Sequence, residues 1–160
     1  FRSRLSRQSG NARRPIRFTA YLPGSELMDS IETRMPYPAD MTKILLAEDD
    51  NDMRRFLVRA LESAGYSVIS YDNGLSAYQR LREEPFELLL TDIVMPEMDG
   101  IELARRASEL DPDIKIMFIT GFAAVALNPD SQAPKDAKVL SKPFHLRDLV
   151  NEVQKVLAAA

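Results

Sequence analysis

The residues of this 160-residue chain that could do chemistry are carboxylates placed directly after runs of apolar residues. Glu48, Asp49 and Asp50 follow the run 44–47, and Asp92 follows the run 86–91. Carboxylates that gather at one place repel one another and raise their own pKa values unless a cation lies among them. Oxygen ligands of this kind suit Mg²⁺ or Mn²⁺. The acids therefore predict a divalent metal site if the fold brings the two segments together.

Two other polar residues stand at the ends of later apolar runs. Thr120 closes the run 114–120, and Lys142 follows the run 138–141. A lysine supplies a positive point charge and a threonine a neutral hydroxyl, and together they can bind the oxygens of a transferred phosphoryl group. One of the carboxylates would then be the nucleophile of a phosphoryl transfer.

The elements that must position these residues are short apolar runs that alternate with amphipathic stretches from Lys43 onward. This alternation is typical of repeated βα units around a parallel sheet. It predicts strands at 44–47, 66–71, 86–91, 114–120 and 138–141. The predicted fold class is α/β, with a doubly wound five-stranded parallel sheet. Because loops at the carboxyl ends of such strands form a crevice, the four polar segments should meet at one edge.

Helices are expected between these strands. The first carries apolar residues at helical spacing and ends at Gly65, which stands where a left-handed C-terminal cap belongs; its apolar residues are Met53, Phe56, Leu57, Ala60, Leu61 and Ala64. Others are predicted at 74–83 and 100–110, and a last one carries apolar residues from Leu146 to Leu157. Because Pro129 and Pro134 interrupt the stretch after Thr120, the fourth helix should be short, irregular or displaced.

The composition of the chain changes near Met41. Residues 1–40 hold seven Arg, no Lys and four acids, for a net charge of +3, whereas the remainder has a net charge of −6. The first segment also shows no sustained hydrophobic period. We interpret 1–40 as a disordered or non-native N-terminal extension and 41–160 as one domain. A basic arm for nucleic acid or a transit peptide is the alternative interpretation of the arginines.

Several classes of protein are disfavoured by the composition. The chain has no cysteine, which excludes disulfides and thiolate chemistry. No apolar stretch reaches the roughly 18 to 20 residues that cross a bilayer, and the start lacks the apolar centre of a secretory signal. The aromatic residues are not interleaved with basic ones as in a surface that stacks on bases. We therefore expect a cytoplasmic protein with no membrane or nucleic-acid partner.

Four segments, ILLAEDD, LLLTDIVMPEMDG, MFITG and VLSKPF, resemble the successive motifs of response-regulator receiver domains from Met41 to the last residue. The resemblance implies a (βα)5 flavodoxin-like receiver fold and a phosphoacceptor that is not itself an enzyme. It implies that Asp92 accepts the phosphoryl group, with Lys142 and Thr120 binding its oxygens. The implied metal ligands for Mg²⁺ or Mn²⁺ are Glu48, Asp49, Asp92 and the backbone carbonyl of Val94. The bond before Pro143 is expected to be cis.

The resemblance also implies partners. In a two-component phosphorelay the donor would be a histidine kinase or a histidine phosphotransfer protein. The similarity extends to stand-alone alphaproteobacterial receivers that act as phosphorylation-controlled adaptors for the ClpXP protease, so this protease or its substrates are expected partners. The alternative is a shuttle that passes the phosphoryl group to a histidine phosphotransfer protein. An aspartyl-phosphate phosphatase would need a second Asp two residues after Asp92, where Val94 stands, and no helix-turn-helix follows the receiver for a DNA-binding regulator.

A few positions depart from the family pattern or invite a function of their own. Val139 stands where many receivers carry Tyr or Phe, so the usual aromatic switch is missing, and Phe122 is a possible substitute. His145, the only histidine, is expected to be exposed at the start of a helix. Arg54 and Arg55 are expected to be solvated on a helix flank.

Overall fold

The computed structural model describes residues 18–19, 28–29 and 41–159. The chain divides into two units, Phe1–Met41 and Thr42–Ala160. In the first, the described residues form an antiparallel pair of strands, β1 (Phe18–Thr19) and β2 (Met28–Asp29). These four residues lie within 1–40, where disorder was predicted. The other residues of that segment lie outside the described residues, so the prediction is not tested there.

The described residues of the second unit form a five-stranded parallel sheet with the order β4-β3-β5-β6-β7. The strands are β3 (Lys43–Ala47), β4 (Ser67–Tyr71), β5 (Leu88–Thr91), β6 (Lys115–Thr120) and β7 (Lys138–Ser141). Their order reverses between β3 and β5, which places a crevice at the carboxyl ends of these strands. The predicted doubly wound α/β fold is confirmed.

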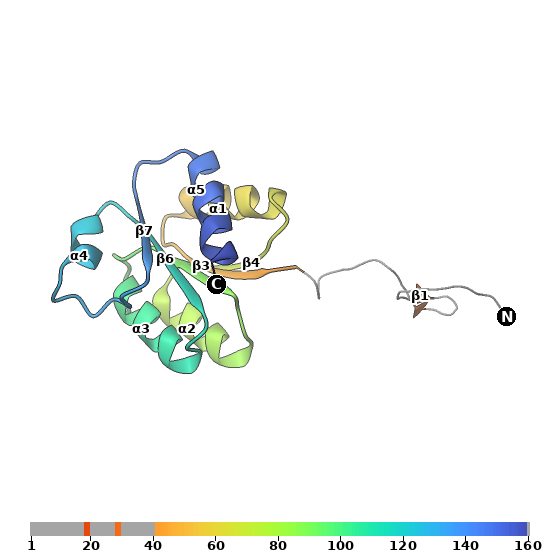
Figure 1. Cartoon of the computed structure of the whole chain (residues 1–160), viewed down its shortest axis with the longest axis horizontal. Helices are drawn as coiled ribbons and strands as arrows, with labels where there is room; N and C mark the ends of the chain where they lie inside the picture. Colours follow the sequence, from red (N-terminus) through yellow and green to blue (C-terminus); the bar gives the residue numbers. More distant parts are fainter. Residues whose placement is uncertain (1–17, 20–27, 30–40, 160) are drawn as a thin grey trace. The chain divides into compact units, whose positions relative to one another are not determined.

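Helices cover both faces of this sheet (Figure 1). They are α1 (Asn51–Ser63), α2 (Gly74–Glu83), α3 (Gly100–Leu110), α4 (Ala123–Leu127) and α5 (Leu146–Ala158). Figure 1 shows α1 and α5 on one side of the sheet and α2 and α3 on the other. None of the helices in the described residues is long and apolar enough to cross a bilayer.

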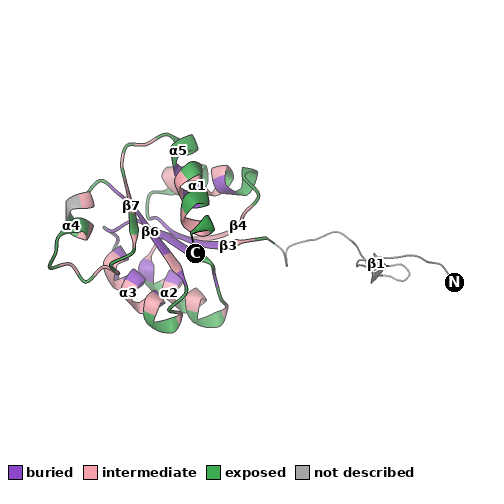
Figure 2. Ribbon diagram, in the orientation of Figure 1, coloured by how far each residue is buried: buried purple, intermediate pink, exposed green. Residues whose placement is uncertain are grey.

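The core consists of two apolar layers, one on each face of the sheet. Side chains of a strand alternate between faces, so Leu45 and Leu89 pack toward α2 and α3, whereas Leu46 and Leu90 pack toward α1 and α5. Figure 2 shows the buried residues concentrated in the strands and on the inner sides of the helices. The two layers together hold the strand ends, and hence the polar residues that follow them, in place.

The helix ends follow from local chemistry. Asp50 caps α1 by accepting a hydrogen bond from the Met53 N–H at 2.9 Å, and Gly65 has a φ of 100°, as predicted from its position after the helix. The fourth helix is short, as the prolines predicted: α4 has five residues, and no side chain among the described residues caps its N-terminus.

Two apolar residues of the helical pattern lie outside the core. The surface of Phe56 is 53% exposed, and Ala64, the C-cap residue of α1, is exposed as well. The inner side of α1 is centred on Leu57 and Leu61, which are fully buried. Because each helical residue is turned by roughly 100° from its neighbour, Phe56 projects to the flank of the helix.

Candidate functional site

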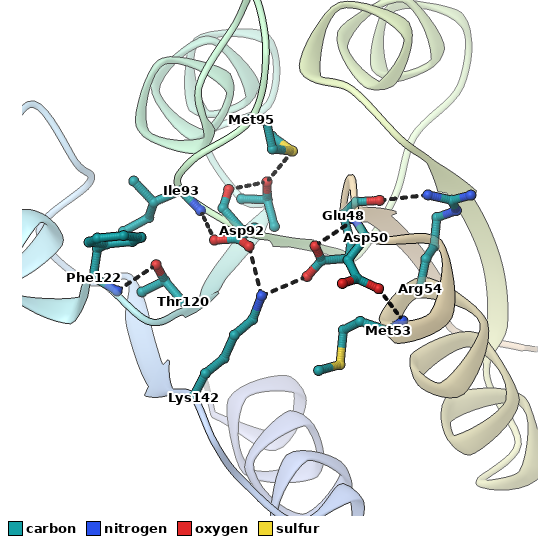
Figure 3. Close-up of polar contacts among 11 residues, drawn as sticks. Glu48, Asp50, Met53, Arg54, Asp92, Ile93, Met95, Thr120, Phe122 and Lys142 are labelled. Carbon is teal, nitrogen blue, oxygen red and sulfur yellow. Dashed lines mark hydrogen bonds and ion pairs between the residues drawn. The ribbon is translucent and has the colours of Figure 1, made fainter.

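The polar residues predicted at the strand ends meet at one edge of the sheet. Backbone hydrogen bonds continue the sheet beyond the strands: the Glu48 N–H donates to Tyr71, the Asp92 N–H to Ala47, and the Lys142 N–H to Thr120, at 3.0, 3.0 and 2.8 Å. These bonds fix the backbone of each residue relative to the neighbouring strand. Figure 3 shows the side chains of Glu48, Asp92 and Lys142 pointing toward one another.

Lys142 connects the two buried carboxylates. Its Nζ lies 2.8 Å from Asp92 Oδ2 and 3.1 Å from Glu48 Oε1 (Figure 3). The second oxygen of each carboxylate accepts a backbone hydrogen bond, from the Ile93 N–H to Asp92 Oδ1 at 2.6 Å and from the Asp50 N–H to Glu48 Oε2 at 3.1 Å. Each carboxylate is therefore held between a backbone amide and the ammonium group.

Burial and pairing change how these groups titrate. Burial raises the pKa of the Glu48 carboxyl, and the Asp50 N–H and the Lys142 ammonium offset only part of this effect. Burial by itself would lower the pKa of Lys142, but the hydrogen bonds to Asp92 and Glu48 outweigh it and leave that pKa above its usual value. Lys142 is thus a stable cation at neutral pH.

The carboxylates also form a set suited to a metal ion. Glu48, Asp49 and Asp92 each offer an oxygen, and these atoms lie within 4.8 Å of one another. Hard divalent cations such as Mg²⁺ bind oxygen ligands of this type. A single ammonium offsets only one of three negative charges, so the donor set and its charge fit a divalent ion.

Thr120 lies fully buried at the end of β6, beside this cluster. Its hydroxyl accepts a hydrogen bond from the Phe122 N–H at 2.9 Å (Figure 3). A hydroxyl that accepts one bond still has a hydrogen to donate. Val94, two residues beyond Asp92 in the same loop, and Phe122 have exposed side chains.

Arg54 was predicted to be solvated, and for this residue the prediction is wrong. Its Nη1 donates to the backbone oxygen of Glu48 at 2.8 Å and its Nη2 to Asn51 Oδ1 at 2.6 Å. The helical Cα–Cβ bond is tilted toward the helix N-terminus, so an arginine near the start of α1 reaches back to the preceding loop. Arg55 is 66% exposed and pairs only with Asp52 in the described residues, as expected.

The loop after Asp92 contains two backbone features that the sequence analysis did not single out. A Cβ on Gly100 would lie 1.9 Å from the backbone oxygen of Asp92, so only glycine allows α3 to approach β5 so closely. Glu97 has a φ of 70°, in the left-handed region. The glycine after Asp99 could have indicated the first feature, whereas nothing in the residue type of Glu97 indicates the second.

Other predictions concern residues around the site. The Lys142–Pro143 bond is cis, as expected. His145 is exposed and precedes α5 without capping it through its side chain. Val139 is partly buried and lines an open pocket of about 180 Å³ together with Phe118, Ala126 and residues of the loop 128–137 that follows α4. Valine is smaller than the Tyr or Phe that many receivers carry at this position, which agrees with the presence of a pocket beside it.

Comparisons with known proteins agree with this geometry. The response regulator receiver domain family matches residues 44–154. The chain is 82% identical over 120 residues to the response regulator receiver protein CpdR of Brucella abortus, covering 75% of this chain and 100% of that protein. It is 39% identical over 118 residues to the sensor kinase CckA of the same organism, covering 71% of this chain and 12% of that protein. A solved response regulator receiver protein from Sinorhizobium medicae superposes with a TM-score of 0.70 at 32% identity, covering 76% of this chain and 98% of the other.

Proposed function

The chain belongs to the response regulator receiver family, and from that premise we propose that Asp92 accepts a phosphoryl group whose arrival switches a protein-binding surface. The observation that carries this proposal is the position of the Asp92 carboxylate. Lys142 Nζ lies 2.8 Å away, and ligand oxygens of Glu48 and Asp49 lie within 4.8 Å. A phosphoryl group on Asp92 would have a cation available for its oxygens and metal ligands beside it.

The proposed reaction is an in-line displacement. An oxygen of Asp92 attacks phosphorus, the bond from phosphorus to the imidazole nitrogen of a phosphohistidine donor breaks, and its electron pair stays on that nitrogen. The product is an acyl phosphate. Mg²⁺ or Mn²⁺ held by Glu48, Asp49, Asp92 and the Val94 carbonyl would offset charge on the phosphoryl oxygens. Lys142 contributes a second positive charge, for which it must exchange part of its contact with Asp92 for a phosphoryl oxygen.

Thr120 would couple this reaction to the surface. Its hydroxyl can donate to a phosphoryl oxygen, and it also accepts the hydrogen bond of the Phe122 N–H. A shift of Thr120 toward Asp92 therefore pulls on the residue that immediately precedes α4. Such coupling changes the balance between two arrangements of the loop and helix that follow β6.

We propose that the surface controlled in this way binds the ClpXP protease or its substrates in the cytoplasm, with the chain acting as an adaptor and not as an enzyme. The support is the 82% identity to CpdR over the whole length of that protein, together with the resemblance to adaptor-type receivers. A phosphorelay shuttle is the second candidate. It is favoured by 29% identity to sporulation initiation phosphotransferase F of Bacillus subtilis, of which the chain covers 93%.

The phosphoacceptor is tested by Asp92→Ala. We expect no acid-labile labelling of this variant by a histidine kinase or a small phosphodonor, because it lacks the carboxylate paired with Lys142. The matched control is Asp113→Ala, which removes an exposed acid at the opposite end of β6 and should be labelled like wild type. Labelling of Asp92→Ala at the wild-type rate would contradict the assignment.

The two outputs are separated by a transfer assay and a binding assay. A shuttle passes label from the phosphorylated chain to a histidine phosphotransfer protein within seconds, whereas an adaptor binds purified ClpX with different affinity before and after phosphorylation. Equal binding in the two states, together with rapid transfer, would favour the shuttle.

A further inference from the structure

Arg54 lies against the backbone of the acidic loop. Its guanidinium bridges two acceptors, the Glu48 carbonyl at 2.8 Å and Asn51 Oδ1 at 2.6 Å. In Figure 3 its side chain reaches from α1 to Glu48, on the side of the loop away from Lys142. The planar guanidinium fork suits two acceptors in fixed positions. Arg54 thus joins the first turn of α1 to the end of β3.

The carbonyl that Arg54 binds belongs to the peptide bond between Glu48 and Asp49. The N–H of Glu48 donates to Tyr71 at 3.0 Å, so the peptide units on both sides of Glu48 are held. The orientation of this peptide determines the direction in which the next residue, Asp49, leaves the backbone. Arg54 therefore acts on Asp49 through a single peptide plane.

Asp49 depends on its backbone more than the other two acids of the cluster do. The Glu48 and Asp92 side chains are held by amides and by Lys142. Within the part of the chain that the structure describes, no hydrogen bond or ion pair holds the exposed Asp49 side chain. Its carboxylate lies within reach of the other two because of where the loop places it.

We propose that Arg54 is a positioning residue for the metal site: by fixing the Glu48–Asp49 peptide, it keeps the Asp49 carboxylate directed at the shared site. This inference rests on the metal site of the proposed function and adds to it a residue that is not itself a metal ligand. Groups that orient metal ligands from behind typically contribute 10- to 100-fold to affinity.

The positive charge of Arg54 and its proposed positioning role predict opposite changes in metal affinity when the residue is replaced. A guanidinium close to the site repels a divalent cation, so removing it should tighten metal binding if charge were its only effect. Loss of positioning would instead weaken metal binding. Arg54→Gln should therefore bind Mn²⁺ more weakly, by roughly 10-fold, although it removes a repulsive charge.

The experiment measures Mn²⁺ binding to the unphosphorylated full chain by electron paramagnetic resonance, in which the six-line signal of free Mn²⁺ disappears on binding. The control is Arg55→Gln, which removes the same charge from the adjacent residue, exposed and paired only with Asp52 among the described residues. It should bind Mn²⁺ within about twofold of wild type.

Arg54→Lys keeps the charge but cannot form the same two hydrogen bonds in one plane, so it should also bind Mn²⁺ more weakly. Urea unfolding in EDTA checks that each variant is folded. If Arg54→Gln does not fold, the Mn²⁺ affinity of Arg54→Lys tests the positioning role.

A variant of the metal ligand itself separates this inference from the proposed function. Asp49→Asn removes a ligand and should abolish specific Mn²⁺ binding. If it does so while the Arg54 variants bind as tightly as wild type or tighter, the positioning role is wrong and the metal site stands. If Asp49→Asn binds like wild type, the metal site is wrong and the inference falls with it.

Discussion

Val94 and Phe122 stand near Asp92 with 54% and 58% of their surfaces exposed. Hydrolysis of an acyl phosphate on Asp92 needs a water molecule in line with the oxygen to phosphorus bond, and polar side chains nearby can orient such a water. Neither of these side chains can form a hydrogen bond. Since both are also bulky, they should shield the phosphoryl group and give it a long lifetime.

We predict that the double variant Val94→Asn with Phe122→Glu loses its phosphoryl group about tenfold faster than wild type, since a well-placed proton acceptor contributes roughly 100-fold or more when fully aligned. The measurement is decay of the purified phosphorylated protein after the donor is removed. Leu110→Glu, an exposed substitution at the end of α3, should decay like wild type. If the double variant decays no faster, access of water is limited by something other than these side chains.

Glu97 has a backbone conformation that costs free energy. A φ of 70° costs a residue with a Cβ about 1–2 kcal/mol in the folded state. Glycine adopts this conformation without that cost, but its greater freedom in the unfolded chain lowers the free energy of unfolding by about 0.5–1 kcal/mol. The difference predicts that Glu97→Gly raises the free energy of unfolding by about 0.5–1 kcal/mol in urea titrations. Glu97→Ala keeps the Cβ and should give no gain. An equal gain in both variants would mean that the side chain of Glu97, and not its backbone, is unfavourable.

At the scale of elements, the junction of β5 and α3 determines where Asp92 lies. The Gly100 N–H donates to the Ile93 carbonyl at 2.7 Å, and α3 begins against the backbone of Asp92 because Gly100 has no side chain. This junction holds the loop that contains Val94 and Glu97. A change here should affect both stability and the candidate site.

We predict that Gly100→Ala lowers the free energy of unfolding by at least about 2 kcal/mol, because its Cβ would overlap the Asp92 backbone and overpacked interiors cost about 1–3 kcal/mol. Gly121→Ala is the control: a Cβ there would meet nothing within 4 Å, so its unfolding free energy should stay within about 0.5 kcal/mol of wild type. Equal stability of Gly100→Ala and wild type would show that α3 can move away from β5 without cost.

The element α4 differs most from the other helices of the described chain. It has only five residues, and Val125 and Leu127 on it are exposed. The open pocket lined by Val139 is formed by the end of α4, the loop 128–137 and the sheet. A five-residue helix that leaves two of its apolar side chains exposed has little packing to lose, which suits an element that changes position.

At the scale of the whole molecule, two apolar layers support one polar edge. The layers bury the strands on both faces, whereas carboxylates that repel one another gather at the carboxyl ends. The ammonium of Lys142 offsets only part of the negative charge at this edge, so a divalent cation bound there would still meet uncompensated carboxylates. Any ion that binds it stabilises the folded state by mass action.

We predict that Mg²⁺ at ten times its dissociation constant raises the free energy of unfolding by about 1.4 kcal/mol relative to EDTA, seen as a higher urea midpoint. The same addition should leave Asp49→Asn unchanged, and K⁺ at equal ionic strength should have little effect on wild type. Equal stabilisation by K⁺ would indicate general screening of charge in place of a site.

The strands, four of the helices and the identity of the polar residues at the strand ends could be predicted from the sequence. Apolar runs and helical spacing are local patterns, and they placed every strand of the second unit within two residues of its observed start and end. The weak fourth helix was also predictable, because proline acts through its own backbone. The parallel sheet then required the polar ends to lie at a common edge.

Tertiary structure alone decided which of these groups touch. Lys142 lies 94 residues from Glu48 and 50 from Asp92 in the chain, so its bridge between them depends on the order of the strands and not on any local pattern. The exposure of Phe56 and the contact of Arg54 with the Glu48 carbonyl depend on how α1 is rotated against the sheet. Rotation and strand order result from the packing of the two apolar layers as a whole, which residue spacing within one segment does not specify.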